Sequence, residues 1–399
     1  MSKLRTLTIG LLLIALLSGA LGAVAQEAGT PVKIAVLGPF TGPAASIGQE
    51  QLNWARLAVA DFNEANGWDV ELVEGDTQLD PAIAVTVAES VIADPYIYGV
   101  VGPAGSQEVE ATAQMFMDAR LVHVSGSATR PSLTQSGWDT FFRTVPTDDV
   151  QGPTDAAFLY NELGLTQLFI IDDQTSYSVG LADQAEAAFT ELGGTVVGRE
   201  SVTQDDTDFS SLVTRIGGSG AEAIFFPGQI ASQGAQLARQ LQEQGVDVTL
   251  MGADGFFSVE DFITGAAGAT EGAYVSAFAP DIHDLESSAD VVERYLEEYG
   301  EFGTFGPPTY AATMVVLEAI QRASASDLTR EAVRDEVANT NVELSVLGGP
   351  LAFDENGDVL NASFYIFQVQ GDNFVLVPYS PEPVVEETPE VEETQEASG

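Results

Sequence analysis

The feature that most constrains this fold is a regular alternation of short apolar runs with longer segments of helical periodicity. The runs Lys33–Leu37, Asp69–Val73 and Ile97–Val101 are typical of buried strands, and each leads through a turn into a helical pattern. Strands and helices that alternate at this spacing form βαβ units. The sequence therefore predicts an α/β fold with parallel sheets.

A second alternation of the same kind begins after residue 160. Its strand candidates are Gln167–Asp172, Ala223–Phe226 and Val248–Met251, with helical patterns between them. The two series join near Arg143–Asp148. This arrangement predicts two doubly wound lobes of similar architecture, although the two halves show no repeated sequence.

The pattern changes after the apolar run Ala273–Phe278. Two helical segments, Ala289–Tyr299 and Thr309–Ala323, follow without a strong strand between them. The chain then reaches two alternating segments, Ser363–Val369 and Phe374–Val377, which predict a β-hairpin.

Both ends of the chain have the composition of non-core segments. Cations at Lys3 and Arg5 precede the apolar run Leu7–Leu17, and small residues follow it, which predicts a cleavable signal peptide over residues 1–25. A membrane anchor is the weaker alternative because the apolar run is short. Residues 378–399 are acidic and lack periodicity, which predicts a disordered acidic tail. We therefore expect export to the periplasm or another extracytoplasmic space.

The charge and cysteine content narrow the class of protein further. The formal net charge is -46, and Lys33 is the only lysine after residue 5. The negative electrostatic field of such a charge excludes nucleic-acid binding and disfavours binding to anionic membrane surfaces. A saline habitat is one explanation for the acidity. There is no cysteine, and hence no disulfide and no lipid-bearing cysteine after the signal.

Catalytic, cofactor and metal motifs are missing from the sequence. His123 lies inside an apolar strand, where a satisfied core residue is the better interpretation than a base, and His283 has no ligand-like neighbours. We therefore expect no enzyme activity, no cofactor and no metal site, although an acidic pair for hydrolysis stays open.

Two turns rich in small residues suggest where a ligand binds. The strand Leu121–Val124 leads into the turn Ser125–Pro131, and an earlier turn ends at Ser106, a candidate N-cap for the next helix. Turns at the carboxyl ends of parallel strands point N–H and hydroxyl groups into a crevice. Side by side, these two turns would form a cradle for a carboxylate.

From Pro31 to about Val377, the sequence resembles the leucine/isoleucine/valine-binding branch of the type I periplasmic binding proteins, the solute receptors of bacterial ABC importers. The motifs that carry this resemblance are Gly38–Pro43, Asp76, Asp80-Pro81, Ser125–Pro131, Arg143-Thr144, Gln151–Pro153, Asp172–Gly180, Asp208–Ser210, Met251–Gly255 and Tyr310–Ala312. Each motif is weak alone, but their order over the chain is specific.

The resemblance implies two lobes that close on a ligand in the cleft between them. Three crossovers would join them, near Pro146–Asp148, Phe278–Pro280 and Leu351–Phe353. Lobe 1 would comprise residues 31–146 and 279–351, and lobe 2 residues 147–278 and 352–377.

The resemblance also implies a site for a zwitterion. Ser106, Ser127, Ala128 and Thr129 would hold an α-carboxylate, while Asp254 would hold the α-ammonium group. A carboxylate suits a cation in a cleft, since a buried charge without a partner is costly.

The remaining candidates surround that site. Tyr177 would line the cleft, and Phe40, Ile47 and Phe305 are candidate apolar walls. Asp148, at the first crossover, either contacts the ammonium group or caps the turn; both alternatives stay open.

This chain departs from the family at several positions. Leu79 and Gly105 stand where relatives have a disulfide, and Ile47 replaces an aromatic residue. Gln229 replaces a tyrosine, so it either favours a polar or amide side chain or is only a rim residue.

The leading hypothesis is a monomeric solute-binding protein that delivers an amino acid, branched-chain or aliphatic, to an ABC transporter permease. A ligand sensor for amino acids, amides or other small carboxylates that signals to a receptor is the main alternative. An exported hydrolase on the same scaffold is a third.

Overall fold

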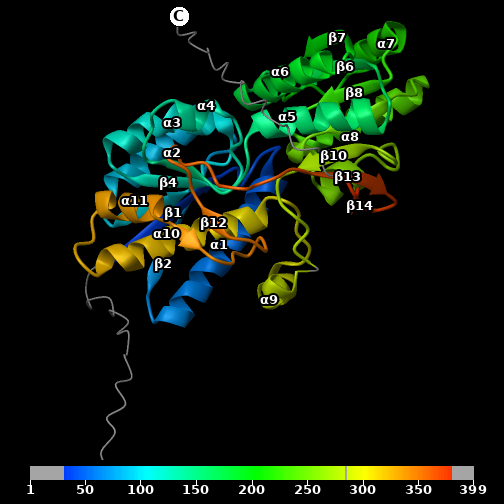
Figure 1. Ribbon diagram of the computed structural model, residues 1–399. Coiled ribbons are helices and arrows are strands. Elements are labelled where there is room, and N and C mark those ends of the chain that lie inside the picture. The colour runs from blue at the N-terminus through cyan, green and yellow to red at the C-terminus, as the bar shows by residue number, and fades with distance from the viewer. Residues whose placement is uncertain (1–30, 284, 380–399) are drawn as a thin grey trace, which may run out of the picture.

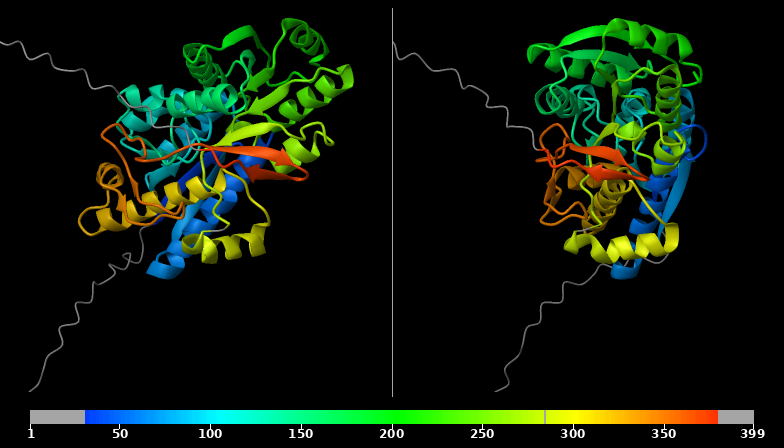
Figure 2. Two further views of the ribbon diagram at one scale, coloured as in Figure 1. Left: turned by 45° about the vertical axis from the view of Figure 1, so that its right-hand side comes forward. Right: turned by 90° about the vertical axis from the view of Figure 1, so that its right-hand side faces the viewer.

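The chain folds into two α/β lobes that lie one against the other, as the two views of Figure 2 and the ribbon of Figure 1 show. The computed structural model describes residues 31–283 and 285–379. The predicted signal peptide and the predicted tail, apart from residues 378 and 379, lie outside these ranges. Among the helices of the described ranges, none combines the length and apolarity needed to cross a bilayer.

A five-stranded parallel sheet forms the first lobe. Its order is β2-β1-β3-β4-β5, so the chain winds first to one edge and then to the other. Neighbouring residues of β1 point to opposite faces: Ile34 packs into one core and Ala35 into the other. The strands are β1 (Val32–Gly38), β2 (Val70–Asp76), β3 (Ile97–Val101), β4 (Val122–Ser125) and β5 (Phe141–Arg143).

Helices cover both faces of this sheet. One face carries α1 (Ala45–Asn66), α10 (Gly306–Ser324) and α11 (Arg330–Ala338), and the other carries α2 (Pro81–Ala93) and α3 (Ser106–Asp118). The remaining helices of this lobe are the short α4 (Ser132–Gln135) and α9 (Ala289–Tyr299). The segments around α9 to α11 come from beyond residue 279 and return to the lobe that the first half of the chain builds.

A seven-stranded sheet of order β14-β13-β10-β9-β8-β6-β7 forms the second lobe. Its parallel strands are β6 (Gln167–Asp172), β7 (Thr195–Ser201), β8 (Ala223–Phe226), β9 (Thr249–Gly252) and β10 (Tyr274–Ala277). The predicted hairpin, β13 (Tyr365–Gln370) and β14 (Asn373–Leu376), adds to β10 in antiparallel orientation. The prediction of an α/β fold with two doubly wound lobes is confirmed.

The helices of the second lobe also lie on both faces of their sheet. One face carries α5 (Asp148–Ala157) and α6 (Ser176–Glu191), and the other carries α7 (Ser210–Ser219) and α8 (Ala231–Gln244). A short 3₁₀ helix, η2 (Asp254–Phe256), follows β9 directly and places Asp254 at the edge of the sheet.

The predicted third crossover at Leu351–Phe353 is wrong. Strand β12 (Leu351–Ala352) pairs with β11 (Asn341–Val342), and Phe353 packs against Phe142 of the first lobe with ring centroids 5.2 Å apart. The chain then turns back, and Leu360 N still donates to Ala352 O at 2.9 Å. The crossover therefore follows Leu360, because a turn keeps the segment before it on the first lobe.

Arg143, the last residue of β5, holds that turn in place. Its buried guanidinium donates to the Asp358 carboxylate, to Ala128 O at 3.1 Å, to Arg130 O at 2.7 Å and to Thr134 Oγ1 at 2.7 Å. A guanidinium has five N–H donors in a fixed plane, so one side chain can join several segments. Arg143 thus ties the turn after β4 to the C-terminal segment.

We expect Arg143→Met to lower the free energy of unfolding by about 3–5 kcal/mol, because it leaves a carboxylate and two carbonyls without their donor. Urea denaturation measures this loss. The matched control is Arg215→Met, which removes an exposed ion pair with Glu200 and should cost less than about 1 kcal/mol. Equal losses in the two variants would contradict the role given to Arg143.

Candidate functional site

The carboxyl ends of the parallel strands in both lobes meet at the boundary between the lobes, where α/β sheets bind ligands. A cavity of about 20 Å³ lies there. Both lobes contribute to its wall, which consists of Ile47, Leu79, Ala104, Ser106, Ser127, Tyr177, Gln229, Asp254, Gly255 and Phe305. This space would hold about one water molecule. The lobes must therefore move apart to admit an amino acid.

Most of the predicted site residues come together in this wall. They are Ile47, Ser106, Ser127, Tyr177, Gln229, Asp254 and Phe305. Thr129 and Asp148 do not line it but are fully buried. Two predictions are wrong. Phe40 packs into the core of the first lobe, and its N–H donates to Asp76 Oδ1 at 2.9 Å. Ala128 packs beside Leu133, and its carbonyl oxygen accepts a hydrogen bond from Arg143.

Ser106 presents a hydroxyl to the cavity at the start of α3. It is not the N-cap that the sequence suggested: Gly105 is, and the Glu108 carboxylate accepts from its N–H at 2.7 Å. Ser106 Oγ accepts from Arg130 N at 3.3 Å, which leaves its proton for a ligand oxygen. The amino end of the helix favours negative charge at the same place.

Ser127 and Thr129 differ in what they can offer a ligand. The Ser127 hydroxyl donates to Ala104 O at 2.8 Å and accepts from Gln51 Nε2 at 2.9 Å, so it has no proton left for a carboxylate. Thr129 Oγ1 is buried and forms no hydrogen bond with any group in the described ranges. Buried hydroxyls normally have partners. Of the hydroxyls predicted to hold an anion, those of Ser106 and Thr129 fit best.

Asp254 forms the acidic side of the cavity. Its Oδ1 accepts from Tyr177 OH at 2.8 Å and from Gln151 Nε2 at 2.9 Å, which leaves Oδ2 as the acceptor for a cation. Burial raises the pKa of Asp254 to about 6. Gln151 belongs to the motif Gln151–Pro153, but its contact with Asp254 could not be predicted from the sequence because the two residues are 103 positions apart. Tyr177 and Gln151 together fix the orientation of the carboxylate.

Asp148 adds a second carboxylate at the first crossover. Neither of its carboxylate oxygens has a hydrogen-bond partner among the described residues, so it does not cap the turn. It lies near the Thr129 hydroxyl without a regular hydrogen bond. Burial, with the nearby charge of Asp254, raises the pKa of Asp148 to about 7. The contact of Asp148 with an ammonium group stays a prediction.

A third buried carboxylate, Asp155, is connected to this pair through hydrogen bonds. Its Oδ2 accepts from Ser276 Oγ at 3.0 Å, and Ser276 Oγ accepts from Gln151 Nε2 at 2.9 Å. Burial raises the pKa of Asp155 well above its ordinary value. Asp155 was not among the predicted site residues, although it lies two helical turns after Asp148 on α5 and the helical spacing could have identified it. The second lobe therefore presents an excess of buried acid that a cation would relieve.

Apolar side chains form another part of the wall. Ile47 and Leu79 of the first lobe pack against Ile230 of the second. The Phe305 ring packs edge-on against Phe278, with centroids 5.3 Å apart. The wall thus contains hydrocarbon as well as groups that can hold charge.

Gln229 also lines the cavity, and its amide oxygen is already in use. Gln229 Oε1 accepts from Gln107 Nε2 of the first lobe at 2.8 Å and from Gln204 Nε2 at 3.3 Å. Neither partner could be identified from the sequence, because both are far from Gln229 in the chain. Gln229 is therefore not simply a rim residue.

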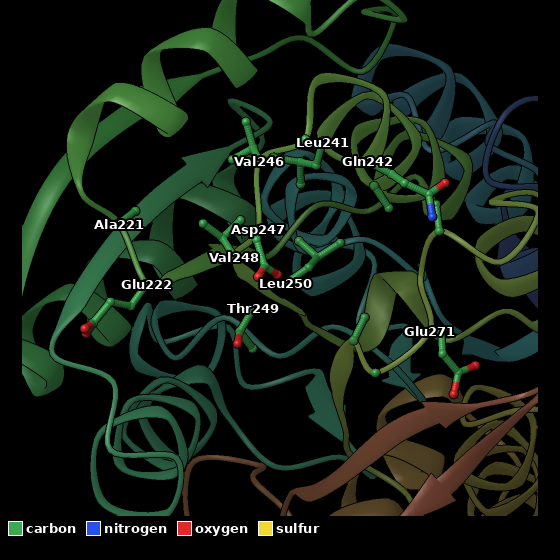
Figure 3. A pocket seen from close by; sticks show the side chains of 15 residues that line it. Ala221, Glu222, Leu241, Gln242, Val246, Asp247, Val248, Thr249, Leu250 and Glu271 are labelled. Carbon is green, nitrogen blue, oxygen red and sulfur yellow. The ribbon is translucent and has the colours of Figure 1, made fainter.

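A larger hollow of about 750 Å³ lies elsewhere on the second lobe, and Figure 3 shows its lining. It is bounded by the end of α8 and by the segments that lead into β8, β9 and β10. These are the amino ends of the strands, opposite to the edge where such sheets bind ligands. We therefore place the candidate site in the smaller cavity between the lobes.

Known proteins resemble this chain over nearly its whole length. The leucine-, isoleucine-, valine-, threonine- and alanine-binding protein of Pseudomonas aeruginosa is 29% identical over 347 residues, covering 86% of this chain and 90% of that protein. The leucine-specific-binding protein of Salmonella typhimurium is 29% identical over 373 residues, covering 93% and 97%.

Solved structures share the same architecture. The leucine-binding protein LivK of Thermotoga maritima matches with a TM-score of 0.79 at 28% identity, covering 87% of this chain and 97% of that chain. LivJ of Streptococcus pneumoniae, solved with isoleucine, matches with a TM-score of 0.79 at 24% identity, covering 87% and 99%; at that identity it supports the fold.

A family model described as periplasmic binding protein matches residues 31–373, almost the whole of the described ranges. The two lobes, the cavity between them and the relatives all agree with this match. The chain belongs to the periplasmic binding protein family.

Proposed function

We propose that the protein captures an aliphatic amino acid, most favourably leucine, isoleucine or valine, and delivers it to the membrane permease of an ABC transporter. The observation that carries this proposal is the composition of the wall of the interlobe cavity. The Asp254 carboxylate and the Ser106 hydroxyl line it together with the apolar side chains of Ile47, Leu79 and Phe305.

Each part of such a ligand has a matching group. The ammonium group would bind Asp254 Oδ2 and the Asp148 carboxylate. Among the described residues of the cavity wall, none has a cationic side chain that could pair with these carboxylates instead. The carboxylate would accept from the Ser106 and Thr129 hydroxyls. The side chain would pack against Ile47 and the other apolar residues.

Closure of the lobes is the mechanism that this geometry supports. The carboxylate sites belong to the first lobe and the ammonium sites to the second, so only a closed protein contacts both ends of the ligand. A ligand that binds one conformation better shifts the population toward it. The permease would then recognise the closed form.

We also propose where the protein is located and whether it alters its ligand. Family membership supports export and a role in solute binding. We further propose that residues 1–25 direct export and that the bound amino acid is released unchanged, so that the protein is not an enzyme. The acids in the site serve to hold a cation.

Leucine, isoleucine and valine should each raise the melting temperature, since a ligand that binds only the folded state stabilises it. A thermal-shift panel of amino acids, amides, polyols and aromatic acids measures this. A shift with an aromatic acid or amide, and none with any amino acid, would contradict the proposed ligand.

Asp254→Asn should weaken leucine binding by about 2–5 kcal/mol, because it removes the charge partner of a buried ammonium group. Isothermal titration calorimetry measures the change. The matched control is Asp247→Asn, an exposed residue of the same lobe in the distant hollow, which should leave the affinity unchanged. Unchanged affinity in Asp254→Asn would remove Asp254 from the site.

Leucine binding should weaken as the pH falls from about 8 to about 5, because Asp148 and Asp254 must be ionised to hold an ammonium group. The dissociation constant should rise by up to about tenfold per pH unit for each proton that binding displaces. Calorimetry in buffers of different ionisation enthalpy counts those protons. A dissociation constant that does not change with pH would contradict this prediction.

The effect of these groups on the unliganded protein has the opposite sign. The pKa values of Asp148 and Asp254 are higher in the folded state than the ordinary value, so the folded state binds more protons than the unfolded state in this range. Their contribution to stability should therefore increase as the pH falls from about 7 to about 4. Thermal unfolding without ligand at each pH provides this comparison.

A further inference from the structure

Gln229 is the one side-chain amide among the described residues that line the cavity. It is 8% exposed, so its amide needs partners within the protein. It finds them in Gln107 Nε2, at 2.8 Å, and Gln204 Nε2, at 3.3 Å. Neither Gln107 nor Gln204 lines the cavity. Gln229 Nε2 donates to Gln107 Oε1 at 3.5 Å, so both polar atoms of the amide have partners outside the cavity wall.

The orientation of these amides is fixed by a carboxylate. Asp173 Oδ2 accepts from Gln229 N at 3.0 Å and from Gln204 Nε2 at 3.3 Å. An ionised carboxylate only accepts hydrogen bonds, so Gln204 must turn its NH₂ group toward Asp173. That same NH₂ group then meets Gln229 Oε1, which in turn receives the NH₂ group of Gln107.

The network also depends on the closed arrangement of the lobes. Gln107 is the second residue of α3 in the first lobe and directly follows Ser106, whereas Gln204 and Gln229 belong to the second lobe. The hydrogen bonds between Gln107 and Gln229 therefore exist only when the lobes have closed. At that moment Gln229 Oε1 accepts two hydrogen bonds and has no lone pair left for a donor on the ligand.

We propose that Gln107 and Gln204 are specificity-determining residues that hold the Gln229 amide away from the ligand and so make the cavity select aliphatic side chains. This inference rests on the proposed function and deepens it. The NH₂ group of a glutamine side chain would be buried beside Gln229 without an acceptor on it, and leaving a buried donor unpaired is costly. We expect leucine to be preferred over glutamine by about a hundredfold.

The test compares the affinities of leucine and glutamine by calorimetry in the full chain and in Gln107→Leu/Gln204→Leu. Leucine has nearly the size of glutamine but cannot donate, so the variant frees the Gln229 amide. We expect the preference for leucine over glutamine to fall by about tenfold or more. Adding Gln229→Leu to that variant should restore the preference, because it removes the freed amide.

The matched control is Gln233→Leu. Gln233 is also buried in the second lobe, but its amide donates to Thr203 O and Asp206 O and does not line the cavity. Its preference for leucine should equal that of the unaltered protein. If the double variant does not fold, Gln204→Ala alone provides the test, since Gln204 is only half-buried.

Three results would overturn the inference. The affinities for leucine and glutamine could fall equally in the double variant, which would make the amides interlobe contacts only. The added Gln229→Leu could leave the lost preference unrestored. The unaltered protein could prefer glutamine, which would leave amino-acid capture intact. A protein that binds neither amino acid would instead contradict the proposed function, which the thermal-shift panel tests separately.

Discussion

The buried guanidinium of Arg143 is the contact on which the geometry of the site depends. It binds two carbonyls of the turn after β4, the same turn that carries Thr129, and it binds Asp358 from a segment 215 residues away. The turn that would hold a ligand carboxylate and the segment before the third crossover therefore form one rigid body. When the lobes move, the part of the site that belongs to the first lobe can then move as a unit without changing its shape.

The part of the site that belongs to the second lobe depends on a different interaction, the repulsion among buried carboxylates. Asp148, Asp155 and Asp254 are buried close together. Within residues 31–283 and 285–379, Arg143 is the cation whose charge acts on Asp148, but its hydrogen bonds go to other groups. Such a cluster is unfavourable in the closed protein until a cation enters it. The same residues that make the ligand necessary for stable closure also define the charge that the ligand must carry.

The sequence predicts the fold well because each βα unit is a local pattern, visible from apolar spacing and turn residues. It fails at the third crossover, since the segment Phe353–Val359 is fixed by contacts with Phe142 and Arg143 that no local pattern reveals. The site shows the same division. Residue types at strand ends point to Ser106 and the family resemblance points to Asp254, but the Gln107–Gln229 pair joins residues 122 positions apart.

The three crossovers have a consequence for the order in which the molecule can form. Each lobe is completed by chain from beyond residue 279: the first needs α10, and the second needs β13 and β14. A polypeptide that emerges from its amino end cannot finish either lobe until its last described residues are available. Asp358 would be among the last of these residues to be synthesised, so Arg143 lacks its carboxylate partner through most of synthesis. The two lobes must then mature together, as a single cooperative unit, and not one after the other.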